Sequence, residues 1–210
     1  MWKMQTMNRK PGHIKMDYLL TGIALLMLST LSMADTQLWI QDPYTSDSVL
    51  TSVRDPDTSL WNAARINHYE ESLKADIAPP LGILTIGKLN IQVPIYNGTE
   101  ELILNRGVGR IKGMAKMDED ANLGISSHRD GYFRGLKDIE VGDDIEIQTT
   151  RGVEKYAVTA INIVPKSDVS VLDPKTEKTL TLVTCYPFYF VGNAPKRYIV
   201  TALPKSPGYD

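Results

Sequence analysis

The chain contains a single cysteine, Cys185, and this lone thiol is its first candidate for chemistry. It follows Thr179–Thr184, a run made only of threonine, leucine and valine, which favours a pleated strand. Pro187 has no N–H to donate, so we expect the strand to end near Tyr186. The strand would then hold the thiol at the start of a loop that a substrate can reach. The alternative is a small buried hydrophobic residue, the usual role of a free cysteine.

A nucleophilic thiol needs a base or a cation beside it, because the thiolate is the reactive form. His128 directly follows a predicted strand and precedes the cysteine by 57 positions (185 − 128 = 57). Arg197 follows the cysteine by 12 positions (197 − 185 = 12) and begins the last predicted strand. A hairpin return would bring its guanidinium beside the sulfur, where fixed donors can hold a carbonyl or a developing oxyanion. Singly, each has an ordinary alternative, a turn histidine or a surface arginine.

The elements that must position these residues are short strands separated by turn signals, starting at about Leu81. Pro94 indicates an edge strand or a bulge, and Glu100–Asn105 indicates a short helix. Seven or eight strands with little helix predict an antiparallel sandwich or a closed barrel. The predicted strands are Gly82–Ile86, Ile91–Tyr96, Leu123–Ser127, Asp144–Thr150, Glu154–Val164, Thr179–Thr184 and Arg197–Ala202.

The N-terminal part has the pattern of a membrane anchor. Four basic residues up to Lys15 precede an apolar run, Tyr18–Ala34, and an acidic flank follows it. The positive-inside rule therefore predicts that residues 1–35 are a cytoplasmic tail and a single-pass anchor in the cytoplasmic membrane, with the remainder outside. A cleaved signal peptide ending near Ser32–Ala34 is the alternative. Either way the thiol is exported and can form no internal disulfide, whereas His13 stays inside.

Residues 36–80 are expected to be an extracytoplasmic stalk with a helix near residues 59–75, and residues 81–210 a catalytic domain. Within the helix, the positions at apolar spacing are Trp61, Ala64 or Arg65, His68 or Tyr69, and Leu73. Thr58 or Ser59 is the expected cap, and His68 is expected to be structural. The formal net charge of −2 gives no electrostatic footprint for nucleic acid.

Three stretches resemble the motifs of the sortases: Asn122–Asp130 around the histidine, Thr181–Phe188 around the cysteine and Arg197–Val200 in the last strand. The stretch Leu104–Gly109 and the sequence Thr-Cys-Tyr-Pro-Phe are most similar to class D members. The resemblance covers about residues 81–204. Ser127 departs from the pattern, since the family often has glycine before the histidine.

The resemblance implies a closed eight-stranded β-barrel and a cysteine transpeptidase. It implies that Cys185 attacks a sorting signal similar to Leu-Pro-x-Thr-Gly and forms a thioacyl enzyme, with His128 transferring protons and Arg197 holding the substrate and oxyanion. The acyl group would pass to an amine of the cell wall or of a pilin. The partners implied are surface proteins that carry the signal and the membrane that holds the anchor. The loop from Pro165 to Lys178 would select the signal.

Two other interpretations stay open at this point: an exported Cys–His peptidase that hydrolyses, and a tethered barrel that only binds. We expect no cofactor. The acidic stretch Asp118–Asn122 suggests calcium, but Leu123 and Arg129 stand where an EF-hand needs glycine and glutamate, so a solvated turn is the prediction. Asp130 is left out of the catalytic set, because its direction relative to His128 is not fixed by spacing.

Overall fold

The computed structural model describes residues 54–206, except residues 60, 190 and 191. The predicted anchor and the first part of the predicted stalk lie outside these residues. None of the helices in the described part is long and apolar enough to cross a membrane.

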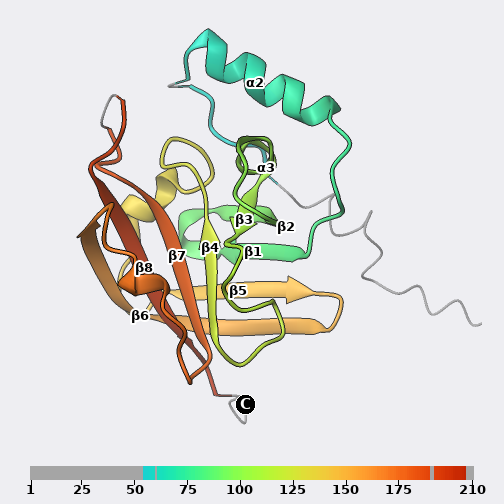
Figure 1. Ribbon diagram of the computed structural model, residues 1–210. Coiled ribbons are helices and arrows are strands. Elements are labelled where there is room, and N and C mark those ends of the chain that lie inside the picture. The colour runs from blue at the N-terminus through green and yellow to red at the C-terminus, as the bar shows by residue number, and fades with distance from the viewer. Residues whose placement is uncertain (1–53, 60, 190–191, 207–210) are drawn as a thin grey trace, which may run out of the picture. The chain divides into compact units, whose positions relative to one another are not determined.

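The described strands close into a barrel in the order β1-β2-β3-β4-β7-β8-β6-β5 (Figure 1). Their bounds are β1 Gly82–Ile86, β2 Ile91–Asn97, β3 Val108–Arg110, β4 Asn122–Ser126, β5 Asp144–Thr149, β6 Gly152–Pro165, β7 Thr179–Tyr186 and β8 Lys196–Pro204. The helices are α2 (Ala63–Lys74), α3 (Glu101–Arg106) and the short 3-10 turns η1 (Gly87–Leu89), η2 (Arg134–Asp138) and η3 (Ser170–Leu172). The mainly β barrel and the short helix at α3 confirm the prediction.

Two strand pairs correct the expectation of an antiparallel sheet: β2 with β3, and β4 with β7, run parallel. Parallel neighbours need a long crossover connection. For β4 and β7 that connection contains the whole β5–β6 hairpin. In the closed barrel β5 pairs with β1, and β6 pairs with β8. Closure also removes the edge strand predicted at Pro94, and the pairing of β1 with β2 passes Pro94 without a bulge. The partner strand β3 pairs only from Ile95 onward, so proline interrupts no ladder there.

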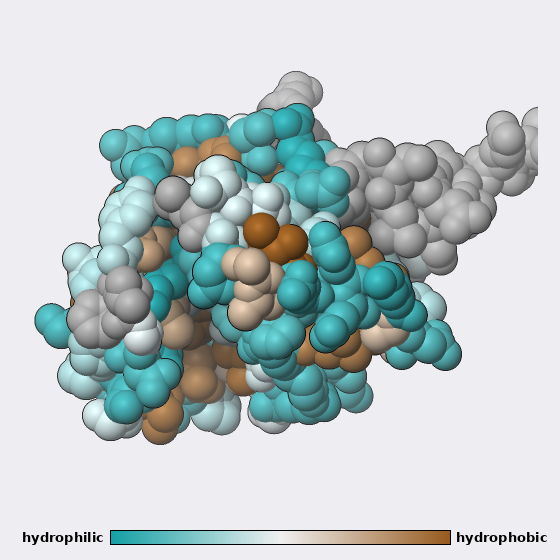
Figure 2. All heavy atoms as spheres, turned by 90° about the horizontal axis from the view of Figure 1, so that it is seen from above, coloured by the Kyte–Doolittle hydropathy of each residue, from teal (hydrophilic) through white to brown (hydrophobic). Residues whose placement is uncertain are grey.

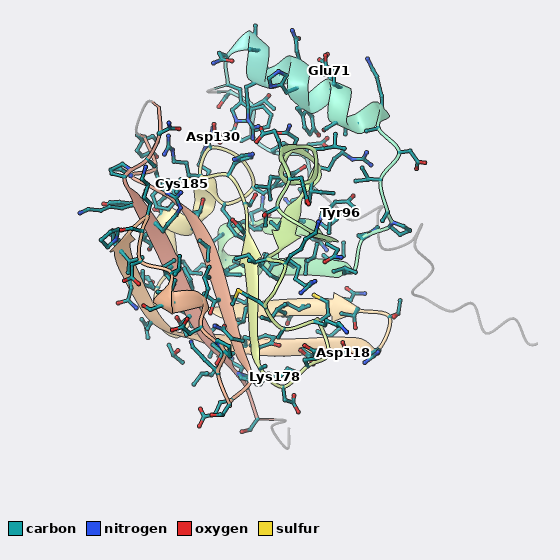
Figure 3. The ribbon with its side chains drawn as sticks, viewed as in Figure 1. Glu71, Tyr96, Asp118, Asp130, Lys178 and Cys185 are labelled. Carbon is teal, nitrogen blue, oxygen red and sulfur yellow. The ribbon has the colours of Figure 1, made fainter. Side chains whose placement is uncertain are left out.

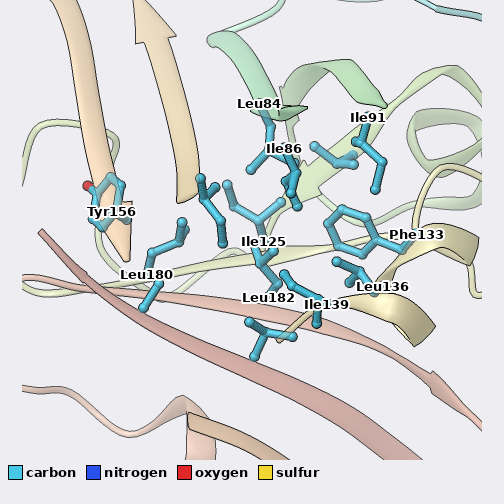
Figure 4. Close-up of a cluster of buried hydrophobic side chains, with 14 of the residues drawn as sticks. Leu84, Ile86, Ile91, Ile125, Phe133, Leu136, Ile139, Tyr156, Leu180 and Leu182 are labelled. Carbon is cyan, nitrogen blue, oxygen red and sulfur yellow. The ribbon is translucent and has the colours of Figure 1, made fainter. Parts of the chain in front are cut away.

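Alternation along β7 decides which side chains fill the barrel. Leu180 and Leu182 point inward and are fully buried, as is Ile125 in the neighbouring β4 (Figure 4); Leu123 of β4 is also buried. Successive residues of a strand face opposite sides, so Thr179, Thr181, Val183 and Cys185 face outward. The core also holds Leu84, Ile86, Val93, Ile95, Phe133, Leu136, Ile145, Ile147, Tyr156, Val158 and Val200.

Helix α2 differs in two details from its prediction. It begins at Ala63, and Asn62 is the cap: its side-chain oxygen accepts a hydrogen bond of 2.9 Å from Arg65 N. Thr58 and Ser59 lie too early to do this. Leu73 is 52% exposed, whereas Ser72 is buried. An Arg106 side chain from α3 donates to Ser72 O at 2.8 Å, so the packed face lies one residue away from the predicted apolar stripe.

The helix that was assigned to a stalk therefore contacts residues of the catalytic domain. The boundary at residue 80 itself stays a prediction. Figure 2 views the molecule from the α2 side, and there hydrophilic residues cover most of the described surface while apolar residues emerge in small groups.

The inward face of β7 generates the first prediction. Leu182→Ala removes a fully buried side chain between β4 and β8, and we expect it to lower the free energy of unfolding by about 2–5 kcal/mol. Val153→Ala is the control, since Val153 is 47% exposed and its loss should cost within about 0.5 kcal/mol. Denaturant titration measures both, and equal losses would contradict the assignment of Leu182 to the core.

Candidate active site

Strand register brings the three predicted site residues side by side. β4 pairs with β7 at a constant offset of 57 positions, from Asn122↔Thr179 to Ser126↔Val183 (183 − 126 = 57). The same offset carries His128 to Cys185 (185 − 128 = 57). On the other side of β7, Cys185 pairs directly with Arg197 in β8. Paired residues of neighbouring strands project to the same face of a sheet, so the three side chains share the outer face of the barrel.

Two hydrogen bonds extend the β4–β7 register beyond the last formal strand pair. Ser127 N donates to Val183 O at 3.3 Å. Thr184 Oγ1, which is buried, donates to Ser127 O at 2.8 Å. These bonds join the backbone directly before His128 to the end of β7 directly before Cys185. Ser127, the departure from the glycine of the resembled motif, is itself buried, and its hydroxyl donates to Gly107 O at 3.4 Å.

A surface cavity of about 310 Å³ opens over this face. Figure 3 shows Asp130 and Cys185 at the same end of the barrel, with Asp118 and Lys178 at the opposite end. The cavity is lined by His128, Arg129, Asp130, Lys166, Cys185, Gly192, Asn193, Ala194 and Arg197. All three residues selected from the sequence therefore line one hollow.

Cys185 is partly exposed to this cavity. A buried, inert cysteine, the ordinary alternative considered above, does not fit that exposure. Arg197 is held at the cavity wall by its own backbone surroundings: Nη1 donates to Ala194 O at 3.2 Å and to Lys196 O at 2.9 Å. Arg197 lines the cavity, and within the described residues no hydrogen bond is made by its Nε or Nη2, so these N–H groups can donate to an anionic oxygen.

The His128 ring lies in a partly buried and charged environment. Burial lowers its pKa from the usual value, and the nearby positive charge of Arg65 lowers it further. The carboxylates of Glu101 and Asp130 act in the opposite direction. Glu101 Oε2 lies 3.4 Å from His128 Nε2, yet this buried nitrogen makes no hydrogen bond within the described chain. Because the pKa is lowered, the ring is mostly neutral at neutral pH and becomes protonated in more acidic solution.

Two charged neighbours of the histidine, Glu101 and Arg65, escaped the sequence analysis, and a third, Asp130, was considered there but left out. Glu101 and Arg65 come from α3 and α2, and only tertiary packing brings them to the site, so no local pattern marks them. Arg65 did fall on the expected packed face of its helix, which was the one available signal. Asp130 lines the cavity beside His128, and its carbonyl oxygen accepts from Trp61 Nε1 at 2.6 Å and from Arg134 Nη2 at 2.9 Å.

The loop between β6 and β7, expected to select a substrate, is fastened to the outer face of β4. Asn122 is buried, and its Nδ2 donates to Val171 O at 3.3 Å and to Asp173 O at 3.0 Å. Its Oδ1 accepts from Thr181 Oγ1 at 2.7 Å. The loop thus borders the same face that carries Cys185, and its Lys166 lines the cavity.

The acidic turn at the other end of the barrel pairs with basic side chains. Asp118 contacts Arg151, and Asp120 Oδ1 lies 3.6 Å from Lys178 Nζ. Glu119 Oε2 accepts from Lys116 N at 2.9 Å. Within the described residues no three histidine, cysteine or carboxylate side chains gather as a metal site would require.

Comparison with known proteins is consistent across sequence and structure. A family model described as a sortase domain matches residues 84–205. Sortase D of Bacillus subtilis (strain 168) is 41% identical over 130 residues, which is 61% of this chain and 66% of that protein. Sortase A of Streptococcus agalactiae serotype III (strain NEM316) is 28% identical over 121 residues, 53% of this chain and 49% of that protein. The chain thus spans less than two thirds of the length of one and about half of the other.

Among solved structures, a Clostridium perfringens Sortase D5 transpeptidase superimposes with a TM-score of 0.56 at 25% identity, covering 71% of this chain and 92% of that one. Sortase C1 of GBS Pilus Island 1 superimposes with a TM-score of 0.58 at 21% identity, covering 73% and 89%. The second likeness concerns the fold alone.

The hydrogen bond between the ends of β4 and β7 gives a prediction. Thr184→Val keeps the shape of the side chain but leaves the buried Ser127 carbonyl without its donor, so we expect a loss of about 1–3 kcal/mol in the free energy of unfolding. Thr159→Val is the matched control, because Thr159 Oγ1 donates to Thr201 O at 3.2 Å in an exposed position where water can replace it. A control that loses as much stability as Thr184→Val would show that the buried bond has no special role.

Proposed function

This chain belongs to the sortase family, and from that premise we propose that it is a cysteine transpeptidase that cleaves a sorting signal through a thioacyl enzyme and passes the acyl group to an amine. The observation that carries the proposal is that Cys185 on β7, Arg197 on β8 and His128 in the loop directly after β4 line one cavity. The 41% identity to Sortase D supports the same assignment.

In the first half-reaction the Cys185 thiolate attacks the carbonyl carbon of the residue before the scissile bond. A C–S bond forms and the electron pair moves onto the carbonyl oxygen. The C–N bond then breaks, and the protonated His128 gives its proton to the departing amine. In the second half-reaction an incoming amine attacks the thioacyl carbon, His128 accepts its proton, and the C–S bond breaks to restore the thiolate.

In this proposal Arg197 stabilises the developing oxyanion. Its guanidinium is already held by two backbone carbonyls, so little rearrangement is needed when negative charge forms. Because Cys185 and Arg197 are direct cross-strand partners, an acyl group on the sulfur lies within reach of the guanidinium.

The partners and the location belong to the same proposal. The substrate would be a surface protein whose signal, similar to Leu-Pro-x-Thr-Gly, lies along the outer face of β4 and β7 beside the β6–β7 loop. The acceptor would be an amine of the cell wall or of a pilin. An N-terminal anchor in residues 1–35 would keep the catalytic domain outside the cytoplasmic membrane, where such substrates and acceptors occur.

The test incubates the full chain, in detergent, with a panel of Leu-Pro-x-Thr-Gly-like peptides and with a small primary amine, and follows products by mass. We expect an amine-joined product and a protein mass increase that corresponds to the acyl fragment. Cys185→Ala should abolish both, because it removes the only thiol. Cleavage that persists unchanged in this variant would end the proposal, and a product carrying water in place of the amine would identify a hydrolase.

Arg197→Lys separates charge from geometry at the oxyanion. An ammonium keeps the charge but cannot reproduce the planar fork, so we expect kcat/KM to fall by about 10²–10³-fold, the range for loss of an oxyanion donor. Lys196→Arg on the exposed adjacent position is the control. Near-normal turnover by Arg197→Lys would mean that this arginine only packs against the loop carbonyls.

A further inference from the structure

Arg65, which lies outside the residues that match the sortase model, acts on the charge state of His128. Helix α2 precedes residue 84, where the sortase model begins. Its Arg65 has only 14% of its side chain exposed, and its guanidinium carbon lies 4.7 Å from the centre of the Trp61 ring. Trp61 in turn donates to Asp130 O, two residues from His128. The helix is therefore fastened to the loop that carries the histidine.

The carboxylate of Glu101 lies between Arg65 and His128 and contacts both. Arg65 Nη1 donates to Glu101 Oε1 at 3.0 Å and also contacts the Asn105 side chain. The other oxygen, Glu101 Oε2, lies 3.4 Å from His128 Nε2. Arg65 Nη2 lies 4.0 Å from Asp130 Oδ1. Glu101 thus uses its two oxygens for two different partners, and its direction is set by the bond to Arg65.

The histidine side of this contact is incomplete while the ring is neutral. Its Nε2 is buried and makes no hydrogen bond within the described residues. A buried nitrogen without a partner costs free energy. Catalytic hydrogen bonds are often long in unliganded structures and tighten in the reacting complex. A protonated ring would convert the 3.4 Å contact into a charge-assisted bond, which is shorter and stronger.

We propose that Glu101 and Arg65 are a positioning pair for His128: Glu101 accepts a hydrogen bond from the protonated ring at Nε2, and Arg65, carried by α2, fixes the direction of that carboxylate. The catalytic role of this pair rests on the proposed transpeptidase function. With Nε2 directed at Glu101, the ring exchanges protons with the substrate amines through Nδ1. Glu101 stabilises the imidazolium that the leaving amine requires, whereas the positive charge of Arg65 limits how far the ring is charged before substrate binds.

The signs of these effects follow from the charges that face the ring. Removing the positive charge of Arg65 raises the pKa of His128, and removing the negative charge of Glu101 lowers it. The charged or titratable groups around the ring come from every packed element: Arg65 from α2, Glu101 from α3, Arg129 and Asp130 from the loop after β4, Lys166 from the loop after β6, Cys185 from β7 and Arg197 from β8.

The test is a pH titration of the His128 imidazole by NMR on the full chain in detergent, with its signals assigned by their loss in His128→Gln. For Arg65→Met we expect the midpoint to rise by at least about 0.5 pH units, and for Glu101→Gln to fall by a similar amount; partial exposure of Glu101 keeps both below the 1–3 units of buried pairs. Arg65→Lys, which keeps the charge, should stay nearer to the wild type than Arg65→Met.

Two matched controls remove one negative and one positive charge at positions away from His128. Glu71→Gln removes an exposed carboxylate from α2 itself (Figure 3), and Arg151→Met removes a 73% exposed arginine that contacts Asp118. We expect both to leave the His128 midpoint unmoved. A purely structural role for the pair would lower the melting temperature without opposite shifts of the midpoint.

Shifts in the same direction, or shifts no larger than those of the controls, would overturn the proposal. If Arg65→Met does not fold, Glu101→Gln decides alone, because Glu101 is largely exposed and its replacement is conservative. The titration needs neither substrate nor thiol and can be repeated in Cys185→Ala. Its outcome is therefore separate from whether the chain proves to be a transpeptidase.

Discussion

The site depends on the register of three adjacent strands. A parallel pairing of β4 with β7 and an antiparallel pairing of β7 with β8 put a histidine, a cysteine and an arginine in one row across the sheet. A slip of one residue would send a side chain to the opposite face. Buried leucines on the inner face and the Thr184–Ser127 bond resist that slip, since the same strands that carry the chemistry outward fill the core inward.

Much of this arrangement could be predicted from the chain itself. The run of threonine, leucine and valine before Cys185, and Pro187 after it, predicted the strand and its end, and β7 ends at Tyr186. The strand pattern alone left a sandwich and a barrel open, and it missed the parallel pairs because local spacing carries no information about which strand becomes a neighbour. The cap of α2 was placed too early, since Thr58, Ser59 and Asn62 are all suitable capping residues and only the packing of the helix selects among them.

The electrostatics of the histidine could not have been predicted in that way. Glu101 and Arg65 meet His128 only after α2 and α3 have packed against one another and against the loop that holds Asp130. Their effect on the pKa of His128 also depends on burial. In open solvent the charges of Arg65, Glu101 and Asp130 would be screened and would shift that pKa little. A segment ahead of the matched sortase domain thus contributes to the environment of the residue that must carry protons.

The most direct measurement is a crystal structure of the full chain after Cys185 has been alkylated by a signal-like peptide ending in a threonine-derived chloromethyl ketone, from which the thiolate displaces chloride. The account predicts a carbon–sulfur bond to Cys185, the ligand oxygen within about 3 Å of the Arg197 guanidinium, and His128 on the side where the amine leaves. A ligand oxygen directed away from Arg197, or a histidine ring too remote to meet the departing amine, would contradict the claim that these three residues act together.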